Sequence, residues 1–162
     1  MTLPVLASEA PVPHADEVAL YVVFRVNGAE YALPAERVLQ MESFDGATPV
    51  PGAVSFLIGV VQIRGRIVPV VDLRMRFGGA AGAPVLDNRI VVGQHGERIV
   101  GLLVDSAREV IKIRRADLKQ PPALLEQSAS NFVMAVAQLG PRLVMIIDFA
   151  KVIGEEQLDV VA

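Results

Sequence analysis

The chain has 162 residues, of which 52% are hydrophobic and 20% are charged, and its formal net charge is −3 with an isoelectric point near 5.4. This balance is typical of a globular protein, excludes a disordered chain and argues against a nucleic-acid binder, which normally carries a basic excess. The absence of cysteine excludes disulfides and thiolate metal sites. The apolar runs fall far short of the ~20 residues that span a bilayer. We therefore expect a cytoplasmic protein that does not insert into the membrane.

The first half of the chain opens with a proline-rich stretch and continues as a β-hairpin. Residues 1–17 lack hydrophobic periodicity, which predicts a flexible tail. Residues 18–26 have the composition of a strand, and Asn27-Gly28 is a strong hairpin signal before a return strand over residues 30–33. For residues 34–41 the pattern fits either a short helix or another short strand.

A second hairpin is predicted over residues 59–73. Its two arms are apolar and rich in β-branched residues, and Gly65 between them can adopt the positive φ that a tight turn requires. The turn therefore holds Arg64 and Arg66 at the tip of a rigid apolar hairpin. Asp72 is expected to cap a helical turn directly after the second arm.

The second half of the chain has a similar order of elements. We predict strands over residues 89–92, 98–104, 110–113, 133–138 and 143–147, a long connection over 114–131, and a short helix capped by Asp148. Residues 93–96 are expected to form a turn. Residues 105–109 resemble residues 34–37 in position and polarity.

Two sequence offsets relate the halves. Residues 59–73 match residues 135–149 at an offset of 76 (135 − 59), which aligns Arg66 with Arg142 and Asp72 with Asp148. Ala32 corresponds to Gly101 at an offset of 69 (101 − 32). We infer a duplicated five-stranded β unit. Because one such unit is too small to bury much core alone, the two copies should pack on each other and leave a groove between them.

The sequence contains no recognisable active site. His14 and His95 lack metal-ligand spacing, and neither a nucleophile elbow nor a phosphate-binding loop is present. The carboxylates Asp72, Asp105 and Asp148 each follow an apolar strand, where capping explains them better than catalysis. We therefore expect no catalytic residue, no metal and no cofactor.

Arg64 is open to two interpretations, a solvated surface charge or a contact to a partner. Arginine is favoured at interfaces because its planar fork binds carboxylates through two hydrogen bonds. Arg66 and Asp72 recur in the second copy and are expected to be structural, whereas Arg64-Gly65 becomes Gly140-Pro141 there. The residue that is not repeated, Arg64, is therefore the strongest candidate for a partner contact.

The segment FLIGVVQIRGRIVPVVDLRMRFG (residues 56–78) resembles the signature of the chemotaxis coupling protein CheW and of the CheW-like domains of its partner kinase. The similarity continues through residues 21–38, 101–110 and 143–153 in the same order. It implies an all-β fold with short helices, in which two SH3-like five-stranded β-barrels intertwine.

The resemblance also sets expected boundaries. A single CheW-like domain is expected over residues 18–156, followed by a C-terminal tail over 157–162. Its two subdomains are expected over about 18–84 and 85–156, and whether the termini cross from one subdomain to the other stays open.

The function that the resemblance implies is that of a non-enzymatic adaptor. Such proteins couple the cytoplasmic domain of a methyl-accepting chemoreceptor to a CheA-type histidine kinase, which docks through its own CheW-like regulatory domain. The family's receptor contacts carry over onto Val38, Gly59 and Arg64. Gln40 and Ile58 join the candidate partner-binding residues because many family members carry an acid and a lysine at these two positions.

Other functions stay open at this point. The departure at Gln40-Met41 leaves undecided which receptor or kinase is recognised, and a non-flagellar chemosensory pathway, driving pili or a second-messenger enzyme, is an alternative. A nucleic-acid-binding module built on SH3-like barrels and a small enzyme with an unfamiliar site are further alternatives, and both are disfavoured by the acidic charge and by the missing motifs.

Overall fold

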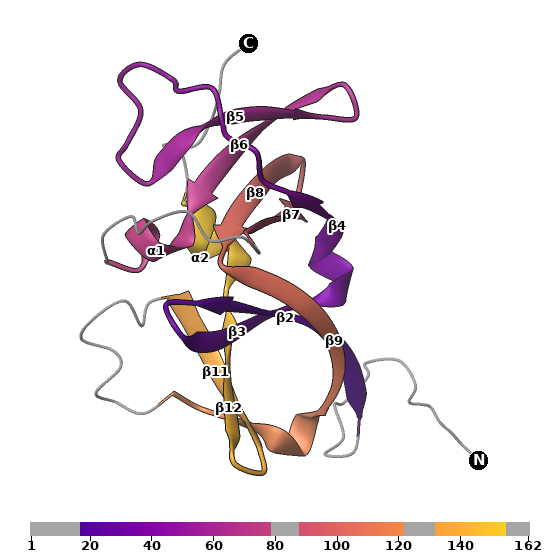
Figure 1. The fold of residues 1–162 in the computed structure, drawn as a ribbon. Helices are drawn as coiled ribbons and strands as arrows, with labels where there is room; N and C mark the ends of the chain where they lie inside the picture. Colours follow the sequence, from indigo (N-terminus) through magenta and orange to yellow (C-terminus); the bar gives the residue numbers. More distant parts are fainter. Residues whose placement is uncertain (1–16, 79–87, 122–131, 155–162) are drawn as a thin grey trace.

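The structure is a computed structural model, and it describes residues 17–78, 88–121 and 132–154. These residues form two β-sheets, which make up two lobes joined at their middle (Figure 1). The predicted C-terminal tail and nearly all of the predicted N-terminal tail lie outside the described residues. The helices of the described part are all too short to cross a membrane.

The first lobe is a six-stranded sheet and the second lobe is a five-stranded sheet. In order of pairing, the first lobe contains β10 (Leu118–Lys119), β11 (Val133–Leu139), β12 (Arg142–Ile147), β3 (Ala29–Pro34), β2 (Val18–Val26) and β9 (Ser106–Arg114). The second lobe contains β4 (Val38–Ser43), β7 (Arg89–His95), β8 (Arg98–Val104), β6 (Arg66–Asp72) and β5 (Leu57–Ile63). The helices are α1 (Leu73–Arg76), α2 (Phe149–Ile153) and the 3-10 turns η1 (Ala35–Arg37) and η2 (Arg115–Asp117).

The two halves of the chain exchange strands. The hairpin β2–β3 of the first half pairs with β9 and β12 of the second half, and the hairpin β7–β8 of the second half pairs with β4 and β6 of the first. Each lobe therefore combines the opening hairpin of one half with later strands of the other. The expected division into residues 18–84 and 85–156 does not describe either sheet, although the expected intertwining is present.

The duplication is visible in the strand register. The parallel strands β6 and β8 pair Val70 with Gly101, and the parallel strands β12 and β3 pair Ile146 with Ala32. The offsets of 76 and 69 convert one pair into the other. The two sheets therefore have equivalent pairings, and the first has one additional strand, the two-residue β10.

Several local predictions are confirmed and others are corrected. Asn27 and Gly28 both have positive φ in a tight turn, as their sequence predicts. Residues 34–41 form both of the suggested elements, η1 and then β4. Residues 105–109, however, lie mostly in β9, because Ala107 continues the ladder by pairing with Phe24. The expected turn at residues 93–96 is shorter, because β7 runs on to His95.

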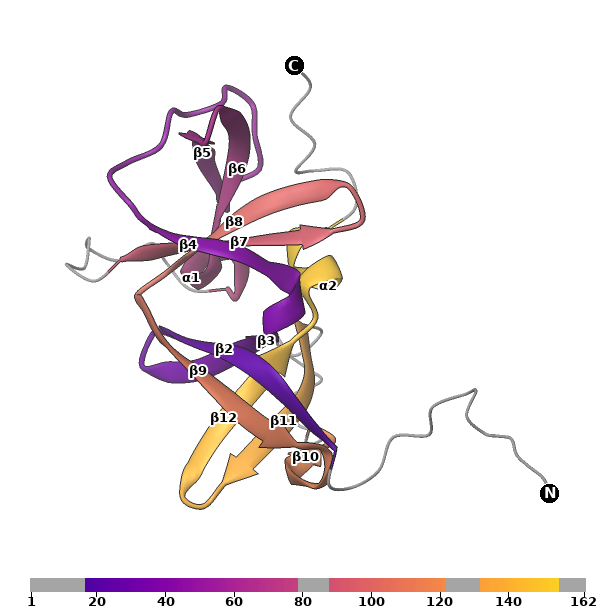
Figure 2. The same ribbon diagram turned by 90° about the vertical axis from the view of Figure 1, so that its right-hand side faces the viewer.

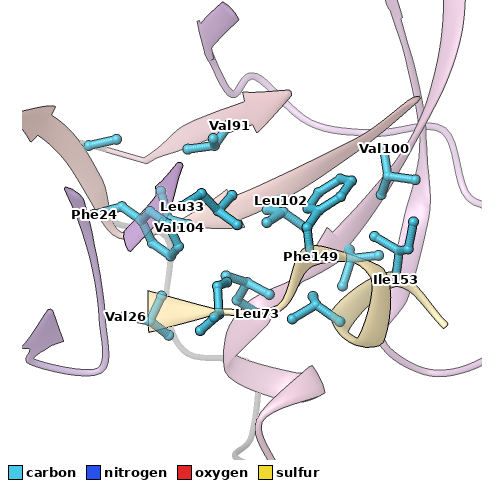
Figure 3. Close-up of a cluster of buried hydrophobic side chains, with 14 of the residues drawn as sticks. Phe24, Val26, Leu33, Leu73, Val91, Val100, Leu102, Val104, Phe149 and Ile153 are labelled. Atoms are coloured by element: carbon cyan, nitrogen blue, oxygen red, sulfur yellow. The ribbon is translucent and has the colours of Figure 1, made fainter. Parts of the chain in front are cut away.

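Buried apolar side chains of the described residues form three clusters. One lies in each lobe, and the largest is shared between them. In Figure 3 the side chains of Phe149 and Ile153 on α2 face Leu102 and Val100 of β8, while Phe24 and Leu33 approach from the first lobe. Burying a large apolar side chain contributes roughly 1.5–3 kcal/mol, so this shared cluster couples the stability of the two lobes.

Candidate partner-binding surface

The hairpin β5–β6 lies at the end of the second lobe that faces away from the first lobe (Figure 2). Ile63 pairs with Arg66, so Arg64 and Gly65 are the two central residues of the turn. Their φ values are 52° and 77°. Both central residues of a type I′ turn need positive φ, which costs a non-glycine residue such as Arg64 roughly 1 kcal/mol. The turn therefore fixes the backbone of Arg64 and leaves its side chain exposed.

Arg64 and Arg66 lie beside Gln40 at a pocket of about 310 Å³, which we call the arginine pocket. The other polar residue that lines it is Gln94 of β7. Its apolar lining consists of Leu39, Ile63, Val68, Val92 and Ile99. None of these nine residues is acidic. Within the described residues, neither the Arg64 side chain nor the Arg66 side chain forms a hydrogen bond or an ion pair. The pocket therefore presents two uncompensated positive charges.

The amide of Gln40 donates a hydrogen bond to the carboxylate of Glu42, two residues along β4. Alternate residues of a strand point to the same face, so this contact follows from the spacing of the two side chains. Glu42 itself lines a neighbouring pocket of about 600 Å³ together with Asp45 and Thr48. The hydrogen bond to Glu42 therefore orients the amide of Gln40.

The other three candidate residues lie elsewhere. Val38 is half-buried against the shared apolar cluster. Ile58 packs against the apolar cluster of the second lobe. Gly59 is buried beside the backbone of Thr48. Of the five candidates, Arg64 and Gln40 line the arginine pocket, and Val38, Ile58 and Gly59 do not.

Gly59 has a local structural role. Its φ is 150°, and it lies at a β-bulge between Leu57 and Gly59 in β5. A Cβ at this position would collide with the carbonyl oxygen of Thr48. The backbone groups of Thr48 and Val60 exchange hydrogen bonds of 2.9 and 2.8 Å, so the close approach of residues 47–48 to β5 requires glycine here.

The three aspartates have structural partners. Asp72 Oδ1 accepts a hydrogen bond of 3.0 Å from the Arg74 amide at the start of α1, and Asp148 Oδ1 accepts one of 3.3 Å from the Lys151 amide in α2. Both predicted caps are confirmed. Asp105, which lies between β8 and β9, instead accepts a 2.8 Å hydrogen bond from the Asn27 amide at the turn between β2 and β3. Within the described residues, no group of three or more His, Asp or Glu side chains could hold a metal ion.

The family comparison agrees with this architecture. The CheW-like domain family model matches residues 20–157, which include the strands of both lobes except for the first two residues of β2. The chain belongs to the CheW-like domain family. The predicted resemblance and the predicted CheW-like fold are therefore confirmed.

Relatives and a solved structure of the CheW family cover most of the chain. The chemotaxis protein CheW of Bacillus subtilis is 30% identical over 135 residues, which are 83% of this chain and 86% of the relative. CheW of Rhizobium meliloti is 28% identical over 136 residues, 84% of this chain and 88% of the relative. The crystal structure of the scaffolding protein TtCheW from Thermoanaerobacter tengcongensis superimposes with a TM-score of 0.79 at 27% identity, covering 87% of this chain and 96% of that one.

Proposed function

We propose that this CheW-family protein is a non-enzymatic adaptor that couples the cytoplasmic domain of a methyl-accepting chemoreceptor to a CheA-type histidine kinase. The observation that carries the proposal is the arginine pocket, in which a rigid turn fixes Arg64 at an exposed pocket with no acid in its lining. An exposed guanidinium without an internal partner is better suited to binding another protein than to stabilising the fold.

Membership of the CheW-like domain family and the structural partners of three aspartates support an adaptor over an enzyme. The relatives are named as chemotaxis proteins and the similar solved structure as a scaffolding protein. Asp72 and Asp148 cap helices, and Asp105 binds a backbone amide, so these candidates for catalysis already have structural partners. The proposed location is the cytoplasm, with recruitment to the membrane through receptors. The net charge of −3 disfavours nucleic acid as a partner.

The experiment is a reconstitution with purified components from the organism that encodes the chain. The receptor cytoplasmic fragment and the kinase are mixed with the wild-type chain, and binding is measured by co-sedimentation and by receptor-dependent kinase activity. Arg64→Ala should bind at least one partner about tenfold more weakly, a change of about 1.4 kcal/mol, with an unchanged melting temperature. The control Arg115→Ala removes another exposed arginine, in η2 of the first lobe, and should bind like wild type. If wild type binds neither protein, the adaptor function is wrong.

A further inference from the structure

The five-stranded sheet of the second lobe has an open seam between its two outer strands, β4 and β5. The pocket of about 600 Å³ that contains Glu42 lies along this seam, and we call it the seam pocket. Its lining comes from the end of β4, from the connection that follows β4, from residues 60–63 of β5, and from Ile67 and Ile90. It shares one lining residue, Ile63, with the arginine pocket. The seam pocket is therefore a separate feature of the second lobe.

The backbone of Gln62 has a free edge in the seam pocket. Ile63 and its partner on β6 flank the two-residue turn, and such a flanking pair exchanges both of its hydrogen bonds across the hairpin. The next pair, Gln62 and Ile67, does not, so the N–H and C=O groups of Gln62 point away from β6 and toward the seam. Val60, two residues earlier, has the same orientation, because its N–H and C=O groups bond to Thr48.

In the first lobe the strand β10 occupies the equivalent edge. At the offset of 76, Val60 of β5 corresponds to Val136 of β11. Lys119 of β10 lies opposite Val136, and Leu118 lies opposite the next residue, Ala137. The first lobe therefore covers this edge with a short strand in which an apolar residue is followed by a lysine.

Within the described residues, the second lobe has no strand at this place. Thr48 lies opposite Val60 and takes the position of the β10 lysine, but this bridge is isolated. Gly46 has a φ of 110°, which is outside the extended conformation of a strand, so the chain before Thr48 turns away from β5. The backbone edge at Gln62 is left open as a result.

The seam pocket carries two acids and no base. Glu42 and Asp45 line it, and the described residues of its lining include no lysine, arginine or histidine. Within the described part of the chain, the Asp45 carboxylate accepts no hydrogen bond and forms no ion pair. The carboxylate of Glu42 accepts a hydrogen bond from the neutral amide of Gln40. The pocket therefore presents two negative charges and attracts a cation.

Apolar side chains complete the lining and distinguish between a peptide and a small cation. Val61, Ile63 and Ile90 belong to the apolar cluster of the second lobe, and Ile67 at the rim is 61% exposed. A small cation would leave both Ile67 and the backbone groups of Gln62 in water. An extended peptide segment with adjacent basic and apolar residues satisfies the carboxylates, the apolar rim and the backbone edge together.

We propose that the seam pocket binds an extended, basic segment of another protein, which adds to the free edge of β5 as a strand. The backbone of the segment pairs with the N–H and C=O groups of Gln62. A lysine or arginine of the segment faces Glu42 and Asp45, and an adjacent apolar residue covers Ile67. Neighbouring side chains of a strand point to opposite faces, so they reach both walls of the pocket. This site does not rest on the proposed adaptor function.

The probe is a short, acetylated and amidated peptide in which leucine and lysine alternate. It is titrated into the full chain labelled with nitrogen-15, and the backbone amide signals are followed by NMR. We expect saturable shifts centred on Gln62 and slower hydrogen exchange of its N–H group, because this group gains an acceptor. Added salt should weaken the binding, since the contact is between opposite charges. A peptide with glutamate in place of lysine should produce no saturable shifts.

Variants test each part of the site. Asp45→Asn and Glu42→Gln should each weaken binding about fivefold, because each removes one charge. Gln62→Pro removes the N–H group at the free edge, a position where an edge strand tolerates proline, and should abolish binding. Glu97→Gln removes an exposed acid from the turn between β7 and β8 and should bind like wild type. Melting temperatures identify any variant that fails to fold.

A modified peptide tests strand addition without changing the protein. Methylation of its backbone nitrogens keeps the side chains and the charge but prevents strand pairing, so binding should be lost. Equal binding of the methylated peptide would overturn strand addition. Unchanged binding to Asp45→Asn and Glu42→Gln would overturn the role of the acids, and no saturable shifts up to about 2 mM peptide would overturn the site itself. Because neither the receptor nor the kinase enters this test, each result is independent of the adaptor function.

Discussion

Arg76 Nε donates a hydrogen bond of 2.7 Å to the carbonyl oxygen of Val152, and the two residues occupy equivalent positions in the two copies of the repeat (152 − 76 = 76). The same guanidinium lies 4.2 Å from the ring centre of Phe56 and 4.8 Å from that of Phe132, another pair separated by 76 residues. Arg76 therefore sits where the two copies meet, and it links α1 to the end of α2.

We expect Arg76→Ala to lower the free energy of unfolding by about 2–3 kcal/mol, because it removes charge-assisted hydrogen bonds and two contacts between cation and ring. Arg76→Lys should retain part of the ring contact and lose the second hydrogen bond, which runs from Nη2 to the Lys151 carbonyl oxygen, so its loss should be smaller. Urea denaturation measures both. The control Arg66→Ala removes an exposed arginine and should change stability by less than about 0.5 kcal/mol. Equal losses for the two alanine variants would contradict this role of Arg76.

Gly59→Ala should destabilise the second lobe by about 2–4 kcal/mol, because the new Cβ meets the Thr48 carbonyl oxygen and the φ of 150° disfavours a side chain. Thermal unfolding measures the loss, and amide exchange at Thr48 and Val60 reports whether their paired hydrogen bonds open. The equivalent residue of the other copy is Ala135, which tolerates the same type of bulge. Ala135→Gly should therefore cost less than about 1 kcal/mol. If Gly59→Ala were equally mild, the packing argument would be wrong.

The sequence was sufficient to predict the repeated strand order and the offsets that relate it. Those offsets map Val70 onto Ile146 and Ala32 onto Gly101, and the structure pairs Val70 with Gly101 and Ile146 with Ala32. The prediction succeeds because equivalent strands of the two copies are buried to a similar extent, so both need apolar residues at equivalent positions. The caps at Asp72 and Asp148 succeed for a similar reason, since each depends only on neighbouring residues.

The exchange of strands between the halves was expected from the family resemblance, but the hydrophobic pattern alone does not predict it. The hydrophobic pattern of β6 does not distinguish β3 from β8 as its partner, and in the structure β6 pairs with β8. The choice is made by chain connectivity and by the shared core. Strand β10 was missed because two residues, Leu118 and Lys119, are too few to show a period. A local pattern therefore predicts which strands exist better than it predicts their partners.

The candidate site was predicted in part. Arg64 was identified because the hairpin tip differs between the two copies, and Gln40 because an acidic residue was expected at its position. Both residues line the arginine pocket. The position of Ile58 inside the second lobe depends on the bulge at Gly59, which the sequence does not reveal. Arg66 was assigned a structural role because it recurs as Arg142, and this assignment stays a prediction. Arg142 binds Glu30 and Glu109, and the equivalents of these two acids in the other copy are Ile99 and Gln40. Aligning Glu30 with Ile99 would have shown that difference.

Both tyrosines of the chain should ionise above their ordinary pKa near 10. Burial raises the pKa of Tyr21, with Glu36 adding to the effect and Arg115 opposing it, and burial raises the pKa of Tyr31. Tyr31 lies between Phe24 and Phe77, with ring centres 6.2 and 4.9 Å away. The unfolded chain releases these protons near pH 10, and the folded chain releases them only at higher pH. The contribution of the two tyrosines to folding stability is therefore fully present below pH 10 and is lost as the pH rises above it.

Absorbance at 295 nm during an alkaline titration measures tyrosinate formation directly. Tyr31→Phe should remove one titrating group and reduce the loss of stability at high pH, while the stability at neutral pH stays nearly the same. Titration of both residues at the pH found for the urea-unfolded chain would contradict the prediction.

Val70→Asp should unfold the protein, because Val70 is 0% exposed and packs in the apolar cluster of the second lobe, where a carboxylate would lose its hydration. An unpaired buried charge costs several kcal/mol, a large part of the 5–15 kcal/mol that stabilises an ordinary domain. Ile67→Asp is the matched control on the same strand, since Ile67 is 61% exposed, and it should change the melting temperature little. Circular dichroism at 25 °C distinguishes the two. Because the apolar cluster between the lobes is shared, loss of the second lobe should also abolish the tertiary signal of Tyr31 in the first, and an intact first lobe would show that the lobes fold independently.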